Sequence, residues 1–177
     1  FNDNLRTDKP PLHYFLMMLS YSIFGVSAFA ARFFSALMGV ITLSVTFYYT
    51  GKNLGKKAAI WMALTLLSSL HFLFQFHLAV PDPYLIACII VAVFAFQDGL
   101  ENQSKKHLFF GYTATALGVL AKGPVALGLV GLVILLYLLF TKQLNGKGLK
   151  QLSIPLGTAW FLGLILPWYI AVGKATN

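Results

Sequence analysis

Long apolar stretches separated by short polar loops constrain this chain more than any other feature. Hydrophobic residues make up 58% of its 177 residues and charged residues only 10%, whereas a soluble domain carries about 25% charged residues. A helix needs roughly 20 mostly apolar residues to cross a membrane. The sequence therefore predicts an all-α, polytopic transmembrane helical bundle.

The apolar stretches predict about six spans and one shorter helix ahead of them. Residues 11–24 are too few to cross the membrane, so this stretch predicts a half-inserted helix that ends in a turn at Gly25-Val26-Ser27. In the first span, Ala31, Ser35 and Gly39 recur every fourth residue and form a small-residue stripe that lets another helix approach closely. The predicted spans cover residues 31–49, 58–77, 84–96, 108–121, 125–140 and 152–172.

The basic residues predict how these spans are oriented. Most of the 13 Lys and Arg residues lie in three short loops, at residues 51–57, 98–107 and 141–150. Because cytoplasmic loops of membrane proteins are enriched in Lys and Arg, all three loops are predicted to face the cytoplasm. The Pro-marked breaks at 81–83 and 122–124, and the opening motif at 8–11, then fall on the outer side. The net charge of +8 is explained by this topology and by anionic lipid, and no nucleic-acid partner is expected.

The two ends of the chain suggest that it is part of a longer protein. The chain opens on a polar segment without an initiator Met, and it stops at Asn177 directly after an apolar stretch. We therefore expect residues 1–177 to be a fragment of a transmembrane domain, with a first span and a first outer loop upstream and a C-terminal part missing.

Two lysines and two carboxylates are predicted to meet on the outer side. Asp8 and Lys9 precede Pro10-Pro11, which fix φ and keep the charged pair extended where a helix begins. Asp82 is predicted to be the N-cap of the helix that follows it, and Lys122 ends an apolar stretch. Each residue is explained equally well as a helix cap or a weak surface ion pair. Together, however, the lysines suit a phosphate, and the carboxylates suit a metal ion or a sugar hydroxyl.

Other polar and aromatic residues are weaker candidates for a site. A site for an isoprenoid phosphate needs an apolar groove below the charges. Phe72, Phe74 and Phe76 are candidates to line it, but ordinary packing is the favoured explanation for these rings. His13 is a weak metal-ligand candidate that also fits a polar helix end. The sequence has no Gly-rich nucleotide loop, Ser/His/Asp set or zinc-ligand spacing, so a lipid-phosphate donor fits better than a nucleotide sugar.

Four motifs of this chain resemble bacterial integral-membrane glycosyltransferases of the GT-C class. In order, they are Asp8-Lys9-Pro10-Pro11-Leu12-His13-Tyr14, Phe24-Gly25-Val26-Ser27 with Ala30-Ala31-Arg32, Pro81-Asp82, and Gly118-Val119-Leu120-Ala121-Lys122-Gly123-Pro124. The nearest group is the dolichyl-phosphate-mannose-protein mannosyltransferase-like family, which includes the aminoarabinose transferases that modify lipid A. The resemblance covers nearly the whole chain. It implies a GT-C-like bundle in the bacterial inner membrane, with its active site on the periplasmic face.

The resemblance also implies a reaction and residue roles. The reaction is the inverting transfer of a sugar from an undecaprenyl- or dolichyl-phosphate donor to a lipid, glycan or protein acceptor. Lys9 would contact the donor phosphate, Lys122 would be a second phosphate contact, and Asp82 matches an acidic residue of the second outer loop. Asp8 stands where family members carry an acidic residue near a divalent metal ion. No residue here matches the family's catalytic base, which we expect upstream of Phe1, so residues 1–177 alone are expected to be inactive.

Two other functions would use the same charged residues. A transporter or flippase for an anionic lipid would bind its cargo with them but would need no base, and broken helices are common in transporters. A non-catalytic membrane scaffold would use the charged breaks only as helix caps. The order of the four motifs favours the glycosyltransferase over both alternatives.

Overall fold

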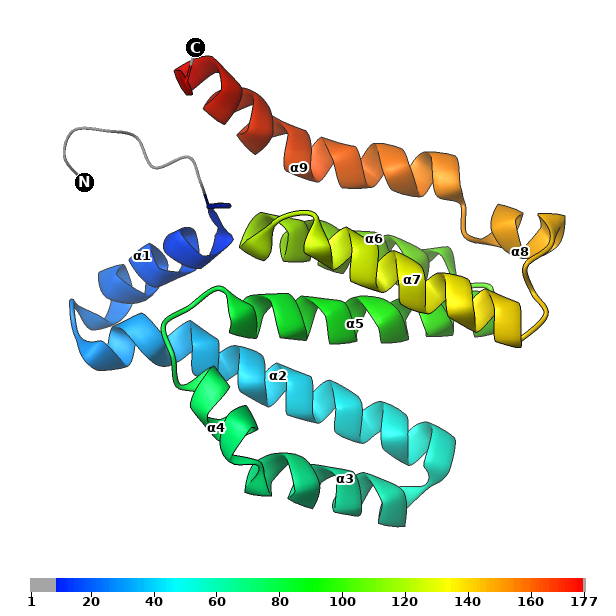
Figure 1. Ribbon diagram of the computed structural model, residues 1–177, viewed down its shortest axis with the longest axis horizontal. Coiled ribbons are helices and arrows are strands. Elements are labelled where there is room, and N and C mark those ends of the chain that lie inside the picture. The colour runs from blue at the N-terminus through cyan, green and yellow to red at the C-terminus, as the bar shows by residue number, and fades with distance from the viewer. Residues whose placement is uncertain (1–8, 177) are drawn as a thin grey trace.

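The protein is a bundle of α-helices, as the sequence predicts. In a computed structural model that describes residues 9–176, this part of the chain forms nine helices and no β-strand (Figure 1). The helices are α1 (Leu12–Phe24), α2 (Ala28–Leu54), α3 (Lys56–Ser68), α4 (Leu70–Phe76), α5 (Asp82–Glu101), α6 (Lys105–Lys122), α7 (Val125–Phe140), α8 (Gly146–Gln151) and α9 (Ile154–Thr176).

The number of helices able to cross a membrane by length and apolar character is smaller than the six predicted spans. Among the described residues, α2, α5 and the segment Gly148–Lys174 meet both conditions. The α3–α4 pair is bent by 70° at its break and adds a fourth crossing if it is one broken span. The helices α1 and α7 are apolar but have only 13 and 16 residues. As predicted, α1 is too short to cross a membrane, and its half-insertion stays a prediction.

Two of the predicted basic loops are largely helical. The helix α2 runs on to Leu54 and α3 begins at Lys56, so only Gly55 separates them, with a φ of 88° that favours glycine. The loop predicted at 98–107 is also shorter, because α5 continues to Glu101. The prediction that the span ends near residue 96 was therefore wrong, and α5 has 20 residues, enough to cross a membrane.

A buried carboxylate explains why α5 continues past its apolar stretch. Asp98 is only 7% exposed, and its two oxygens accept hydrogen bonds from the Tyr49 hydroxyl and the Lys52 ammonium of α2. Because the charge is paired, Asp98 need not face water as a loop residue would. This cluster holds α2 against α5 at the basic end of the bundle.

The turn between α1 and α2 and the small-residue stripe of α2 are confirmed. Gly25 ends α1 with a φ of 74°, and the Ser27 hydroxyl accepts a hydrogen bond of 3.1 Å from the Ala30 amide. Ser35 and Gly39 are buried in α2. A Cβ atom on Gly39 would lie 2.9 Å from Cγ of Phe76, so glycine is what allows α4 to approach here.

The three phenylalanines of α4 do not line one groove. Phe76 is buried and its ring centroid lies 4.7 Å from that of Phe72, whereas Phe74 is 67% exposed. The alternative of a shared aromatic groove is therefore not supported, because residues two apart on a helix face in different directions. Ordinary packing, the favoured explanation, agrees with the burial of Phe76.

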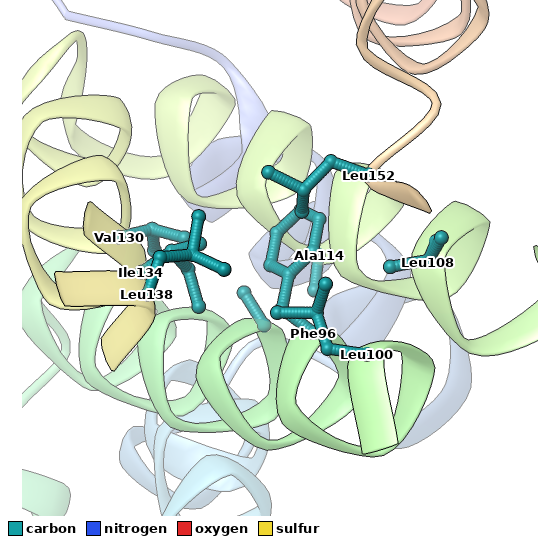
Figure 2. Close-up of a cluster of buried hydrophobic side chains, with 9 residues drawn as sticks. Phe96, Leu100, Leu108, Ala114, Val130, Ile134, Leu138 and Leu152 are labelled. Atoms are coloured by element: carbon teal, nitrogen blue, oxygen red, sulfur yellow. The ribbon is translucent and has the colours of Figure 1, made fainter. Parts of the chain in front are cut away.

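The main core joins α5, α6 and α7. Figure 2 shows buried side chains of these helices pointing toward one another, together with Leu152. Gly111 of α6 is packed so closely that a Cβ atom would lie 3.0 Å from the Phe96 ring of α5. This packing aligns α5 and α6 as neighbours, and since they run in opposite directions, the start of α5 lies beside the end of α6 (Figure 1).

Candidate functional site

Three charged segments meet at one end of the bundle. They are the start of α1, the connection from α4 to α5, and the connection from α6 to α7 (Figure 1). The three basic segments lie at the opposite end, where α2 meets α3, α5 meets α6 and α7 meets α8 (Figure 1). The predicted separation of the opening motif and the Pro-marked breaks from the basic loops is therefore present in the structure.

The structure joins two of the predicted site residues directly. The Lys122 ammonium, at the end of α6, donates a hydrogen bond to Oδ1 of Asp82, 40 residues earlier in the chain. The two side chains keep 47% and 32% of their exposure. The pair is therefore accessible from outside the bundle, and an incoming anion can reach the ammonium.

Asp82 does not have the capping role that the sequence predicts. The helix α5 begins at Asp82 itself, and the N-cap position is Pro81, whose side chain has no group that can accept a hydrogen bond. The Asp82 carboxylate thus lies in the first turn, where the helix dipole stabilises a negative charge. It is engaged with Lys122 instead of with a backbone amide.

The break after Lys122 fixes where its ammonium lies. Gly123 has a φ of 91°, and its amide donates a hydrogen bond of 2.7 Å to the Val119 carbonyl, which ends α6. Pro124 then occupies the N-cap position of α7. Lys122 therefore sits at the tip of the bundle, at a helix C-terminus that favours a cation.

Lys9 lies at the same end, exposed at the start of α1. The following residues tie α1 to α5: Pro11 is buried at the N-cap position, and the His13 ring packs edge-on against the Tyr84 ring at a centroid distance of 5.3 Å. Burial of the imidazole, together with the nearby Lys9 charge, lowers the pKa of His13 below its usual value of 6.5. Since Tyr84 is two residues after Asp82, this contact brings the opening motif toward the Lys122–Asp82 pair.

The described residues offer no complete metal site. Within residues 9–176, no three His, Cys, Asp or Glu side chains come together. His13 is buried against an aromatic ring, and its Nδ1 atom has no hydrogen-bond partner in the described part of the chain. Asp8, the residue predicted to lie near a metal ion, falls outside the described residues, so a divalent metal there stays a prediction.

Sequence reasoning missed two of these contacts. It placed Lys122 and Asp82 on the same side but gave no reason for a direct pair, and it gave no reason for Tyr84 to contact His13. The one available signal was position, because Tyr84 follows Asp82 at the start of a helix and His13 follows Lys9 at the start of another.

The fold matches that of a solved structure. It agrees with the crystal structure of ArnT from Cupriavidus metallidurans bound to undecaprenyl phosphate, with a TM-score of 0.84, over 94% of this chain and 31% of that chain, at 24% identity. This match confirms the GT-C-like architecture predicted from the sequence.

Relatives of known sequence are considerably longer than this chain. A protein of Aquifex aeolicus (strain VF5), described as uncharacterized, is 34% identical over 165 residues, which are 93% of this chain and 38% of the relative. The undecaprenyl phosphate-alpha-4-amino-4-deoxy-L-arabinose arabinosyl transferase of Enterobacter sp. (strain 638) is 26% identical over 184 residues, covering 99% of this chain and 32% of the relative. The chain thus spans about a third of the length of these relatives.

The family assignment comes from a match along almost the whole chain. Residues 8–170 match the family described as dolichyl-phosphate-mannose-protein mannosyltransferase, and the match begins at the opening motif. The order of the charged breaks along the chain and its helical bundle agree with this match, and the chain belongs to the dolichyl-phosphate-mannose-protein mannosyltransferase family.

Proposed function

We propose that the protein transfers a sugar from a polyprenyl-phosphate donor to a lipid, glycan or protein acceptor on the non-cytoplasmic face of a membrane. The observation that carries the proposal is that the start of α1, which follows Lys9, and the end of α6, which is Lys122, lie at one end of the bundle (Figure 1), in a chain of this family. Two comparisons support a lipid-phosphate donor: ArnT, which has the same fold, is bound to undecaprenyl phosphate, and one relative is an arabinosyl transferase named for such a donor.

The charge changes of the reaction explain the need for two cations. A sugar linked to a polyprenyl phosphate is a phosphodiester with one negative charge. An acceptor hydroxyl attacks the anomeric carbon, a base takes the hydroxyl proton, and the bond from the anomeric carbon to the phosphate oxygen breaks. The lipid then leaves as a phosphate monoester, on which a second negative charge develops. Lys9 and Lys122 interact more strongly with the leaving group than with the donor. They therefore lower the activation free energy of sugar transfer in addition to stabilising the bound donor.

Asp82 has a different role in this proposal. Its pair with Lys122 is half-exposed, and pairs of this kind contribute little to stability. The carboxylate therefore restricts where the ammonium lies but can exchange it for the donor phosphate. Once released, the same carboxylate can accept a hydrogen bond from a sugar hydroxyl.

We assign the catalytic base to none of the described residues. As the family resemblance implies, we place it ahead of the opening motif, so residues 1–177 alone should not turn over. A divalent metal ion near Asp8 stays a prediction, and no step of the proposed transfer depends on it. We place the protein in the bacterial inner membrane with Lys9 and Lys122 on the periplasmic side, since the basic segments lie at the opposite end of the bundle.

The proposal is tested by replacing Lys9 in the full-length protein. Lys9→Ala should abolish transfer of a radiolabelled sugar from an undecaprenyl-phosphate donor in proteoliposomes, while membrane insertion is unchanged. Lys57→Ala removes the same charge from an exposed position at the other end of the bundle and should leave transfer intact. Unchanged transfer by Lys9→Ala would remove the phosphate role, and donor binding without turnover in the wild-type protein would favour a transporter.

A further inference from the structure

A groove at the basic end of the bundle combines an apolar interior with a cationic mouth. Its volume is about 540 Å³. Val45 and Tyr48 of α2 form one wall and Phe110 of α6 the other. Val91 and Ala95 of α5, which packs against both α2 and α6, form the floor. The groove therefore follows the helices away from the end of the bundle and into its apolar part.

The mouth of this groove carries exposed basic side chains. Lys106 and His107, in the first turn of α6, line it. Nearby, the Lys52 ammonium lies 5.5 Å from the centroid of the Tyr49 ring, and Tyr49 also lines the groove. The acidic groups of this end are already engaged. Asp98 accepts hydrogen bonds from Tyr49 and Lys52 of α2. Glu101 accepts one hydrogen bond from Gln97 and one of 3.3 Å from Tyr137 of α7.

We propose that this groove binds one anionic phospholipid. The phosphate lies at Lys106 and His107, and an acyl chain lies along Val91 and Phe110. A soluble anion would use the mouth and leave the apolar floor empty, and a zwitterionic lipid carries its own cation into a region that is already positive. Basic pockets between transmembrane helices on the cytoplasmic side are suited to anionic head groups. The site lies at the opposite end of the bundle from Lys9 and Lys122, so it is separate from the proposed donor site (Figure 1).

The proposal is tested by lipid binding to the full-length protein, measured by native mass spectrometry in detergent. Phosphatidylglycerol and phosphatidylcholine with the same acyl chains are added to the wild type and to three variants. Lys106→Ala should weaken phosphatidylglycerol binding roughly fivefold, the effect of one charge near a membrane surface. Lys150→Ala is the matched control, because this exposed lysine of α8 does not line the groove. Val91→Phe fills the floor without changing charge and should reduce binding in the same way.

The lipid-binding results distinguish binding in this groove from binding elsewhere on the protein. Preferential retention of phosphatidylglycerol that is lost in Lys106→Ala but kept in Lys150→Ala supports the proposal. Equal loss in both lysine variants, equal retention of phosphatidylcholine, or no retained lipid overturns it. Transfer activity is not the readout, so failure here leaves the proposed glycosyltransferase reaction untouched.

Discussion

Replacing Lys122 by alanine separates a catalytic role of its ammonium from a structural one. The side chains of Lys122 and Asp82 keep 47% and 32% of their exposure, and exposed ion pairs contribute roughly 0.2–1 kcal/mol. Loss of the pair should therefore lower the free energy of unfolding by no more than about 1 kcal/mol. If the ammonium meets the charge that develops on the leaving phosphate, kcat should fall on the order of 100- to 1000-fold, or roughly 2.7–4 kcal/mol of activation free energy.

A double-mutant cycle with Asp82→Asn sharpens this prediction. Full-length protein in proteoliposomes is assayed for single-turnover transfer, and the thermal midpoint is measured in detergent. Asp82→Asn keeps the ammonium and should reduce transfer less than Lys122→Ala does. Asp82→Asn should lower the transfer rate less in the Lys122→Ala background than in the wild type. Part of its effect on the rate comes from the changed position of the Lys122 ammonium, which that background lacks.

Two results would refute this reasoning. One is a Lys122→Ala variant that keeps wild-type kcat but loses several kcal/mol of stability, which would make the pair a structural element. The other is full additivity of the two substitutions, which would mean that Asp82 acts independently of Lys122. Lys122→Arg keeps the charge and should retain part of the activity, so it distinguishes loss of charge from loss of fold.

Three further predictions concern packing and charge elsewhere in the bundle. Gly39→Val should lower the stability by about 1–3 kcal/mol through its clash with Phe76, whereas Gly131→Val, with no atom within 4 Å of its Cβ position, should shift the thermal midpoint little. Asp98→Ala removes the acceptor shared by two α2 side chains and should cost about 1–3 kcal/mol, measured by thermal unfolding. Since the pKa of His13 is lowered in the folded protein, the unfolded state binds the proton more readily as the pH falls below about 6.5. The wild type should therefore lose more thermal stability than His13→Gln between about pH 7.5 and about pH 5; parallel curves would contradict this.

The sequence was most informative where backbone chemistry and charge agreed. Gly25 and Ser27 predicted a turn that the structure contains, and Lys122 before Gly123-Pro124 predicted the end of one helix and the start of the next. Charge distribution also predicted which breaks share an end of the bundle. These features depend on neighbouring residues, so a single sequence is enough to infer them.

The features that the sequence did not reveal depend on distant partners. Asp98 resembled a loop residue because its partners, Lys52 and Tyr49, are 46 and 49 residues away. Without the register between α2 and α5, nothing indicated that its charge would be paired and its helix would continue. For the same reason, the sequence did not reveal which phenylalanine of α4 packs against α2, where Phe76 lies against Gly39.

The most direct test of the account is the side of the membrane that Lys9 and Lys122 face. In a full-length variant without other cysteines, Lys9→Cys, Lys122→Cys and Lys57→Cys are each treated with a membrane-impermeant maleimide on intact spheroplasts and again after permeabilisation. We expect the first two substitutions to be labelled on intact spheroplasts and Lys57→Cys to be labelled only after permeabilisation. Labelling of positions 9 and 122 from opposite sides would contradict it, because no single donor phosphate would then reach both ammonium groups.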